Sequence, residues 1–97
     1  HSSHWYEWGC MLYARFIFEG KDVPQDADKA AELYNRVWDV AIREAIANGG
    51  VINEHHGVGL KLGRYMKDLY KNSFPILQGI KKTLDPNNIM NPGKMGL

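Results

Sequence analysis

The chain has a single cysteine, Cys10, among its 97 residues. One thiol cannot form an internal disulfide, and it cannot supply the repeated thiolates of a cysteine-based zinc finger. So little cysteine fits a reducing compartment, and we expect a cytoplasmic location. Because Cys10 lies inside an apolar run, we interpret it as a small core residue rather than a nucleophile.

Long apolar runs and blocks of one charge are also missing. No segment approaches the roughly 20 apolar residues of a membrane-spanning helix, and the opening residues 1–4 do not resemble a secretory signal. Twelve basic residues against eleven acidic ones leave a net charge of +1, without a lysine-rich or arginine-rich run. These absences argue against nucleic acid and anionic membranes as partners.

A chain of this length is one domain at most, and its start without a methionine leads us to expect that residues precede it.

Hydrophobic periodicity predicts the elements. Alternation over residues 9–19 predicts a strand with one core face, and the i, i+3, i+4 spacing of apolar residues after Asp26 and Asp28, either of which can cap it, predicts a long helix. Gly49 and Gly50 then end that helix. We further expect a turn over residues 20–24, a short strand over 51–53, a helix over 62–70, a helix over 74–84 capped by Ser73 with Pro75 in its first turn, and an aperiodic tail over 87–97.

This order of elements predicts an α+β fold, in which helices cover a small antiparallel sheet, as in half of a ferredoxin-like unit. Two strands make a poor free-standing sheet. We therefore expect further strands, either from the rest of a longer chain or from a partner, to complete it.

The residues most able to do chemistry are Glu54, His55 and His56, followed by Gly57 and Gly59. A carboxylate and two imidazoles in a row form either a solvated loop or a site. Histidine ionises near neutral pH, so it can take a proton from an alcohol. The Gly-x-Gly pair lets the backbone turn closely past a ligand, or is simply a tight turn, and it lacks the spacing of a dinucleotide fingerprint.

Residues near the N-terminus form a second polar cluster. His1 and His4, with Glu54 or His55, could ligate a divalent metal such as zinc or manganese, or could be ordinary exposed histidines. Tyr13 and Arg15 share one face of the predicted strand, where a phenol and a guanidinium could meet an anionic substrate. The alternative for Tyr13 is an ordinary cross-strand aromatic residue.

Three groups of residues together resemble the C-terminal part of FAD-linked oxidases of the vanillyl-alcohol-oxidase type, which include glycolate oxidase subunits, D-lactate dehydrogenases and alkyldihydroxyacetonephosphate synthase. The groups are His1 to Gly9 leading into Leu12-Tyr13, then Gly49-Gly50 and His55-His56-Gly57-Val58-Gly59 with Lys61, and finally Lys81-x-x-Leu84-Asp85-Pro86 continued by Asn87 to Lys94. The resemblance spans nearly the whole chain. It implies that residues 1–97 are the C-terminal part of a ferredoxin-like cap domain that lies over FAD, with the cofactor held mainly by an N-terminal FAD-binding domain outside this chain.

The resemblance also implies roles for residues. The hydroxy-acid dehydrogenase branch of the family has Glu-His-Gly, which is matched here by His55-His56-Gly57. The alkyldihydroxyacetonephosphate synthase branch has three histidines, matched by Glu54-His55-His56, and a catalytic tyrosine, matched by Tyr13. Each pattern differs from this chain at one position. His56, common to both, is the first candidate for proton transfer, followed by His55 and Tyr13. Arg15 and His4 are candidates for holding a small anionic substrate, Asn91 and Lys94 for contacts with the flavin, and His1, His4 and Glu54 for a metal.

Two classes of function remain open at this point. The first is the catalytic cap of a flavoenzyme, which oxidises a 2-hydroxy acid such as D-lactate or glycolate, or which works like alkyldihydroxyacetonephosphate synthase. The 97 residues alone should then be inactive, and the whole protein could form a homo-oligomer. The second is a free-standing module that binds a metal or small ligand through His1, His4, Glu54, His55 and His56.

Overall fold

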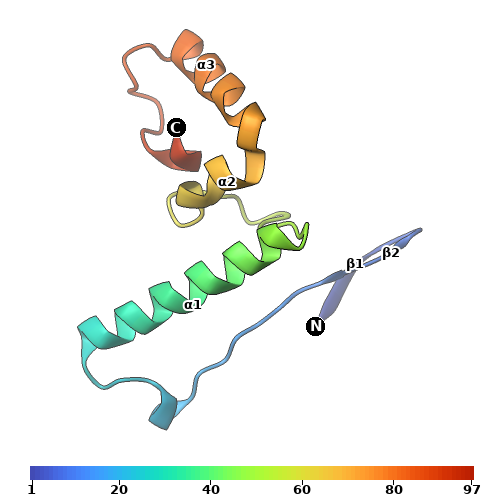
Figure 1. The fold of residues 1–97 in the computed structure, drawn as a ribbon, viewed down its shortest axis with the longest axis vertical. Helices are drawn as coiled ribbons and strands as arrows, with labels where there is room; N and C mark the ends of the chain where they lie inside the picture. Colours follow the sequence, from blue (N-terminus) through green and yellow to red (C-terminus); the bar gives the residue numbers. More distant parts are fainter. The chain divides into compact units, whose positions relative to one another are not determined.

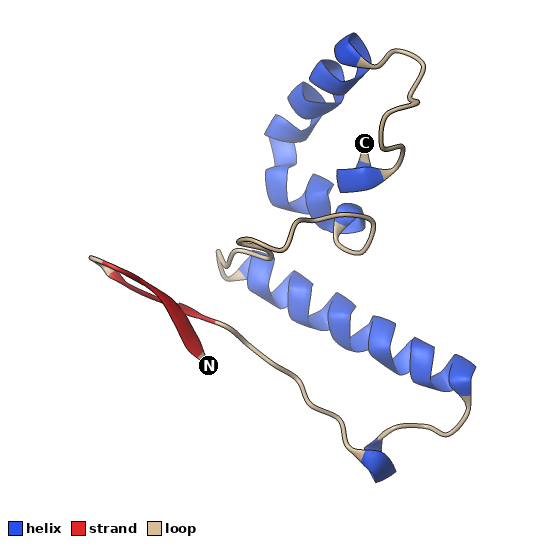
Figure 2. Ribbon diagram, turned by 180° about the vertical axis from the view of Figure 1, so that it is seen from behind, coloured by secondary structure: helices blue, strands red, loops and turns tan.

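The computed structural model describes all 97 residues, which fall into two compact units, residues 1–34 and 35–97. The strands β1 (Ser2–Tyr6) and β2 (Gly9–Leu12) precede the helices α1 (Ala27–Ala47), α2 (Met66–Tyr70) and α3 (Phe74–Leu84), as Figures 1 and 2 show. Short 3-10 turns cover Gly20–Asp22, Gly63–Tyr65, Lys71–Ser73 and Lys94–Gly96. The predicted α+β class with a small antiparallel sheet is confirmed. None of the helices combines the length and hydrophobicity needed to cross a membrane.

The first unit contains a β-hairpin. β1 and β2 pair antiparallel, with Ser2 opposite Leu12 and an irregularity between Ser3 and Trp5. The predicted strand over residues 9–19 is therefore too long, since β2 ends at Leu12, and β1 itself was not predicted as a strand. Tyr13 still exchanges backbone hydrogen bonds with His1, but residues 14–19 have no neighbouring strand to pair with, so alternation of side chains alone does not make them a strand.

The prediction that Cys10 is a core residue is wrong, because Cys10 is exposed. Its neighbours Trp5 and Leu12 are also exposed, by 79% and 80%. A two-stranded hairpin has no second layer that could bury either of its faces. The apolar residues of this hairpin are therefore not buried within the first unit.

Helix α1 begins and ends as predicted. The Oδ1 atom of Asp26 accepts a hydrogen bond from the backbone N–H of Lys29 at 3.0 Å, which caps the helix. At the other end, the N–H of Gly50 donates to the carbonyl of Ala45 at 2.7 Å, and the N–H of Gly49 donates to that of Ile46 at 3.1 Å. These two hydrogen bonds together form a Schellman motif. Gly49 takes the left-handed conformation that the motif needs, with φ at 73°.

The core of the second unit forms along one face of α1. Ile42, Leu62 and Tyr65 are buried, and four partly buried side chains pack against them: Trp38, Ile46, Ile52 and Val58. Trp38, Ile42 and Ile46 are four residues apart, so they share one side of the helix. The expected strand over residues 51–53 is absent. Ile52 instead packs on α1 as part of a loop.

The remaining helices follow the prediction closely. The helix expected over residues 62–70 is the turn Gly63–Tyr65 followed by α2, and α3 covers the expected residues with Pro75 in its first turn. The predicted capping role of Ser73 is wrong, because its side chain makes no capping hydrogen bond. Its backbone is already helical, since a 3-10 turn leads directly into α3.

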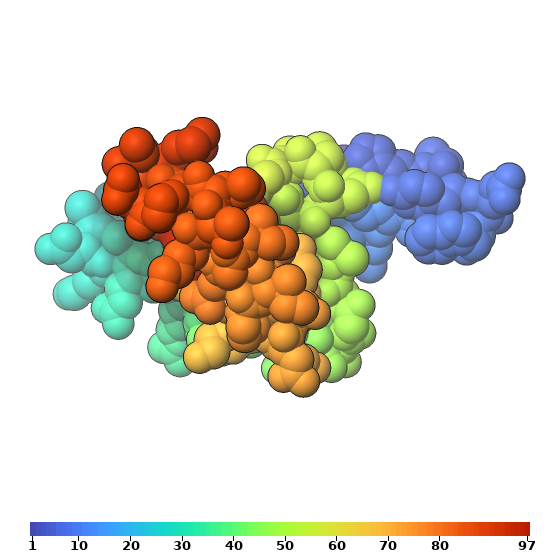
Figure 3. All heavy atoms as spheres, turned by 90° about the horizontal axis from the view of Figure 1, so that it is seen from above, coloured from blue at the N-terminus to red at the C-terminus, as the bar shows by residue number.

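The C-terminal tail returns to the second unit. The N–H of Met95 donates to the carbonyl of Gly59 at 3.1 Å. A Cβ atom on Gly63 would lie 2.9 Å from the backbone nitrogen of Gly96, so the two glycines allow a close backbone approach. In Figure 3 the red tail lies beside the orange residues of α3.

Candidate active-site loop

The histidine loop, defined as residues 53–59, is anchored near both of its ends. Ile52, just before the loop, and Val58, near the end of the loop, both pack against the core that lies on α1. The Oδ1 atom of Asn53 accepts a hydrogen bond from the backbone N–H of His56 at 3.1 Å, which closes a local turn. The φ angles of 81° at Gly57 and 54° at Gly59 then turn the chain, in a region that residues with a Cβ atom rarely adopt.

Glu54 and His55 form a pair within this loop. The Nδ1 atom of His55 lies 3.0 Å from the Oε2 atom of Glu54, and the side chains are 46% and 30% exposed. An ionised Glu54 carboxylate can only accept a hydrogen bond, so this contact favours the forms of His55 in which Nδ1 carries a hydrogen.

His56 lies against His55. The centroids of the two rings are 4.1 Å apart, with an angle of 61° between their planes. An extended strand would have placed these neighbours on opposite sides. The chain instead bends at residues 54–56, and the two imidazoles come together.

The loop continues into Lys61, whose Nζ atom lies 3.6 Å from the centroid of the Trp38 ring on α1. A cation over an indole face is held by the ring's electron density. Lys61 is part of the motif that follows the histidines, but sequence spacing gives no sign of its contact with Trp38, which is 23 positions away (61 − 38). The contact ties the end of the loop to α1.

The candidate residues of the first unit gather on its hairpin. The N-terminal nitrogen of His1 donates to the carbonyl of Tyr13 at 2.9 Å, and their rings are 5.4 Å apart, edge to face. The Cζ atom of Arg15 lies 5.7 Å from the centroid of the Tyr13 ring. His4, with φ at 51°, sits at the irregularity in β1. His1 and His4 belong to the first unit and Glu54 to the second, so the metal site that would join them stays a prediction.

Asn91 and Lys94 lie in the exposed part of the tail. Asn91 has a φ of 50°, and its carbonyl accepts a hydrogen bond from the N–H of Lys94 at 3.3 Å. Because the side chains of Asn91 and Lys94 are exposed, they are available to a group outside the chain.

The residues that shape this tail are Asp85 and Lys81. The carboxylate of Asp85, only 7% exposed, accepts hydrogen bonds from the N–H of Ile89 at 3.0 Å and of Met90 at 2.9 Å. Lys81 bonds to Asp85 and to the carbonyl of Met90. The hydrogen bond from Lys81, helped by those from the backbone, lowers the pKa of Asp85. Only the i, i+4 spacing of the two charges gave a signal for this pair in the sequence.

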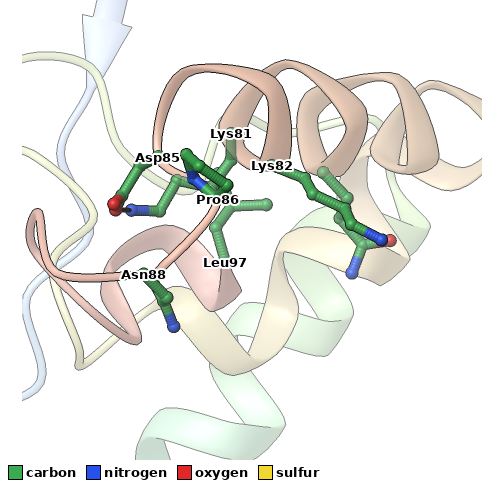
Figure 4. A pocket seen from close by; sticks show the side chains of 7 residues that line it. Lys81, Lys82, Asp85, Pro86, Asn88 and Leu97 are labelled. Atoms are coloured by element: carbon green, nitrogen blue, oxygen red, sulfur yellow. Dashed lines mark hydrogen bonds and ion pairs between the residues drawn. The ribbon is translucent and has the colours of Figure 1, made fainter.

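A small hollow of about 270 Å³ lies next to this pair, as Figure 4 shows. Its lining comes from the end of α3, the following turn and the last residue: Gln78, Lys81, Lys82, Asp85, Pro86, Asn88 and Leu97. The hollow is smaller than the pockets of roughly 300–1,000 Å³ that enclose ligands in proteins. It is too small to hold a dinucleotide.

The chain is similar to several curated proteins. It is 33% identical to an uncharacterised FAD-linked oxidoreductase, YgcU, of Escherichia coli over 96% of this chain and 19% of that protein. It is 31% identical to alkyldihydroxyacetonephosphate synthase of Trypanosoma brucei brucei over 98% of this chain and 15% of that protein. A third relative, D-lactate dehydrogenase of Archaeoglobus fulgidus, is 39% identical over 53% of this chain and 12% of that protein. No solved structure matches the chain.

The chain thus spans a fifth or less of the length of these relatives. The model of one protein family matches residues 1–95, which is nearly the whole chain. That family is described as FAD linked oxidases, C-terminal domain. By this match and the identities above, the chain belongs to the C-terminal domain family of FAD-linked oxidases.

Proposed function

We propose that this chain is the C-terminal part of the cap domain of an FAD-dependent oxidoreductase that oxidises a 2-hydroxy acid such as D-lactate or glycolate. The observation that carries the proposal is the histidine loop, which brings His55, His56 and Glu54 together in a chain of this family. Relatives named D-lactate dehydrogenase and glycolate oxidase subunit support the class of substrate.

FAD would be bound mainly by a domain outside these residues, as the resemblance to FAD-linked oxidases implies and as the short coverage of the relatives supports. The exposed amide of Asn91 and the ammonium group of Lys94 fit supporting contacts, because both can donate hydrogen bonds to a cofactor held elsewhere. When bound, the flavin supplies the chemistry of accepting a hydride from the hydroxyl-bearing carbon.

In this proposal, His56 takes the proton of the substrate hydroxyl. An imidazole is suited to that task near neutral pH. His55, whose Nδ1 faces Glu54, and Tyr13 assist the proton transfer. Arg15 and His4 hold the carboxylate of the substrate, and a guanidinium suits that role because its N–H groups match the two carboxylate oxygens.

A second candidate function is the reaction class of alkyldihydroxyacetonephosphate synthase. The similarity to the Trypanosoma brucei brucei enzyme over 98% of this chain favours it. In this alternative, Glu54, His55 and His56 stand where the related enzymes have three histidines, and Arg15 would meet a phosphate instead of a carboxylate.

The test is an anaerobic titration of the full-length protein with D-lactate, glycolate and an acyl-dihydroxyacetone phosphate, followed by the visible absorption of the flavin. Bleaching by a hydroxy acid supports the first function, and a change only with the phosphate ester supports the second. A full-length protein without flavin would overturn both.

The His56→Ala variant tests the proposed base. We expect flavin content to stay normal and the rate of substrate-driven bleaching to fall by roughly 10²–10⁴-fold, which is the usual contribution of general base catalysis. Lys82→Ala, a change at an exposed residue of α3, is the control. Unchanged bleaching in His56→Ala would remove His56 from the proposal.

A further inference from the structure

The backbone of the histidine loop contains two residues that do not restrict its shape. Gly57 and Gly59, which follow the two imidazoles, both have positive φ angles. Glycine has no Cβ atom and gives up more conformational freedom on folding than any other residue. The position of His56 therefore depends on what fixes the chain before and after these glycines.

Packing fixes the chain on both sides. Ile52 and Val58 pack against the core, and Leu62, only 6% exposed, belongs to that core. The N–H of Leu62 donates to the carbonyl of Val58 at 3.2 Å, which closes a turn over residues 58–62. Lys61 lies inside this turn, directly before buried Leu62, and is itself exposed.

The side chain of Lys61 adds an anchor of a different kind. Its Nζ atom lies 3.6 Å from the centroid of the Trp38 ring, and Trp38 packs against the same core as Ile52 and Val58. The aliphatic part of a lysine can cover an aromatic ring while its ammonium group stays hydrated, so this contact requires no buried charge. The ring attracts the cation through the electron density of its face. Trp38 thus connects the turn after the histidines to the core that holds the loop.

We propose that Lys61 is a positioning residue for the reaction: its ammonium group on the Trp38 ring fixes the turn after the histidine loop and so holds His56 where it accepts the proton of the substrate. The inference rests on the proposed function, in which His56 is the base. Lys61 itself takes no proton and does not contact the substrate. Displacing a reacting group by about 1 Å can lower a rate by roughly 10²-fold, so an anchor outside the reacting groups can control the rate.

Reduction of the flavin in the full-length protein separates positioning from substrate binding. Lys61→Met removes the charge and keeps an unbranched side chain, whereas Lys61→Arg keeps a cation that stacks on indole rings. We expect Lys61→Met to slow bleaching at saturating substrate by about 2- to 30-fold, which corresponds to about 0.5–2 kcal/mol for a cation–π contact. The substrate concentration that gives half the maximal rate should not change, and Lys61→Arg should recover most of the rate. Lys67→Met, the same change at an exposed residue of α2, is the matched control.

Three kinetic results would overturn the proposal. Lys61→Met could bleach at the normal rate throughout, which would remove Lys61 from the reaction. It could reach the normal rate only at a higher substrate concentration, which would make Lys61 a substrate-binding residue. Equal losses in Lys61→Met and Lys61→Arg would show that a cation on the Trp38 ring is not the cause.

Hydrogen exchange of the full-length protein without substrate tests the same anchor independently of turnover. Lys61→Met should speed exchange at the backbone amides of residues 53–59 by about 2- to 30-fold and leave those of α3 unchanged, because the loop then opens locally. In a Trp38→Leu background the same substitution should add no further increase, since the ring is already absent. If Trp38→Leu does not fold, the comparison of Lys61→Met with Lys61→Arg decides.

Unchanged exchange in the loop of Lys61→Met would overturn the proposal. Faster exchange throughout the chain would also overturn it, by giving Lys61 a role in global stability instead of in the loop. A full-length protein whose flavin no substrate bleaches would contradict the proposed function, whereas the exchange experiment would still report on the anchor. The two failures are therefore distinguishable.

Discussion

At the residue scale, the side chain of Asp85 is both buried and bonded to several partners. It is one carboxylate with three bonded partners, Lys81 and the N–H groups of Ile89 and Met90, and it is almost fully buried. A buried carboxylate is tolerated only when its oxygens are satisfied in this way. The Lys-x-x-Leu-Asp-Pro motif therefore has a structural task, which is to set the path of the tail.

This geometry predicts a dependence of stability on pH. The pKa of Asp85 is lowered in the folded state, chiefly by the hydrogen bond from Lys81. The carboxylate therefore stabilises the fold above the pKa of an unfolded aspartate, about 3.9, and this stabilisation is lost as the pH falls through the lower folded value. Thermal unfolding of the full-length protein should show Asp85→Asn less stable than the wild type at pH 7, with a difference that shrinks below about pH 4. A difference that stays constant across this range would contradict the role of the charge.

At the scale of elements, α1 organises the second unit. Its face of Trp38, Ile42 and Ile46 holds both the loop that carries the histidines and the turn before α2. The position of the candidate site thus depends on helix packing.

The Ile42→Ala substitution tests this dependence. Ile42 is 6% exposed, and its truncation should lower the free energy of unfolding by about 2–5 kcal/mol, because it leaves a cavity in the core. Val40→Ala, on the other side of α1 with 57% exposure, should change it by no more than about 0.5 kcal/mol. Denaturant unfolding of both variants checks this expectation, and equal effects would contradict the assignment of the core face.

The approach of Gly63 to Gly96 offers a second test. An added Cβ atom at Gly63 would lie 2.9 Å from the nitrogen of Gly96, so Gly63→Ala should destabilise the fold by roughly 1–3 kcal/mol through overpacking. Gly79 in α3 has no atom within 4 Å of such a Cβ, and Gly79→Ala should stabilise by about 0.5–1 kcal/mol. Opposite shifts in melting temperature are expected, and a shift in the same direction would contradict the packing of the tail.

At the scale of the whole molecule, the chain spans a fifth or less of the length of the relatives named above. In the proposed function it is one part of a larger flavoprotein, and the FAD-binding part lies outside these 97 residues.

We therefore expect the 97 residues, purified alone, to show no flavin absorption after incubation with FAD, whereas the full-length protein retains the cofactor. The comparison needs only visible spectra of the two proteins after removal of unbound FAD. Stoichiometric flavin on the short chain would contradict the proposal that the cofactor is held mainly elsewhere.

Sequence alone determined the features that depend on local interactions. The cap at Asp26, the Gly49-Gly50 end of α1, and the extents of α1 and α3 follow from hydrogen bonds and periodicity within a few residues. The family also followed from the sequence, because its motifs are read as strings of residues.

Tertiary structure decided the rest. Alternating residues over 9–19 and 51–53 form a strand only where a neighbouring strand offers its backbone, and that cannot be seen in a single segment. The packing of Ile52 and Val58 on α1 and the contact of Lys61 with Trp38 join segments that are far apart in the sequence. The turn that brings His55 and His56 together is local, but periodicity does not reveal it because it depends on one side-chain hydrogen bond, from the N–H of His56 to Asn53. Residue types thus indicated which chemistry this chain can do, and the packing of the loop on α1 set where it can be done.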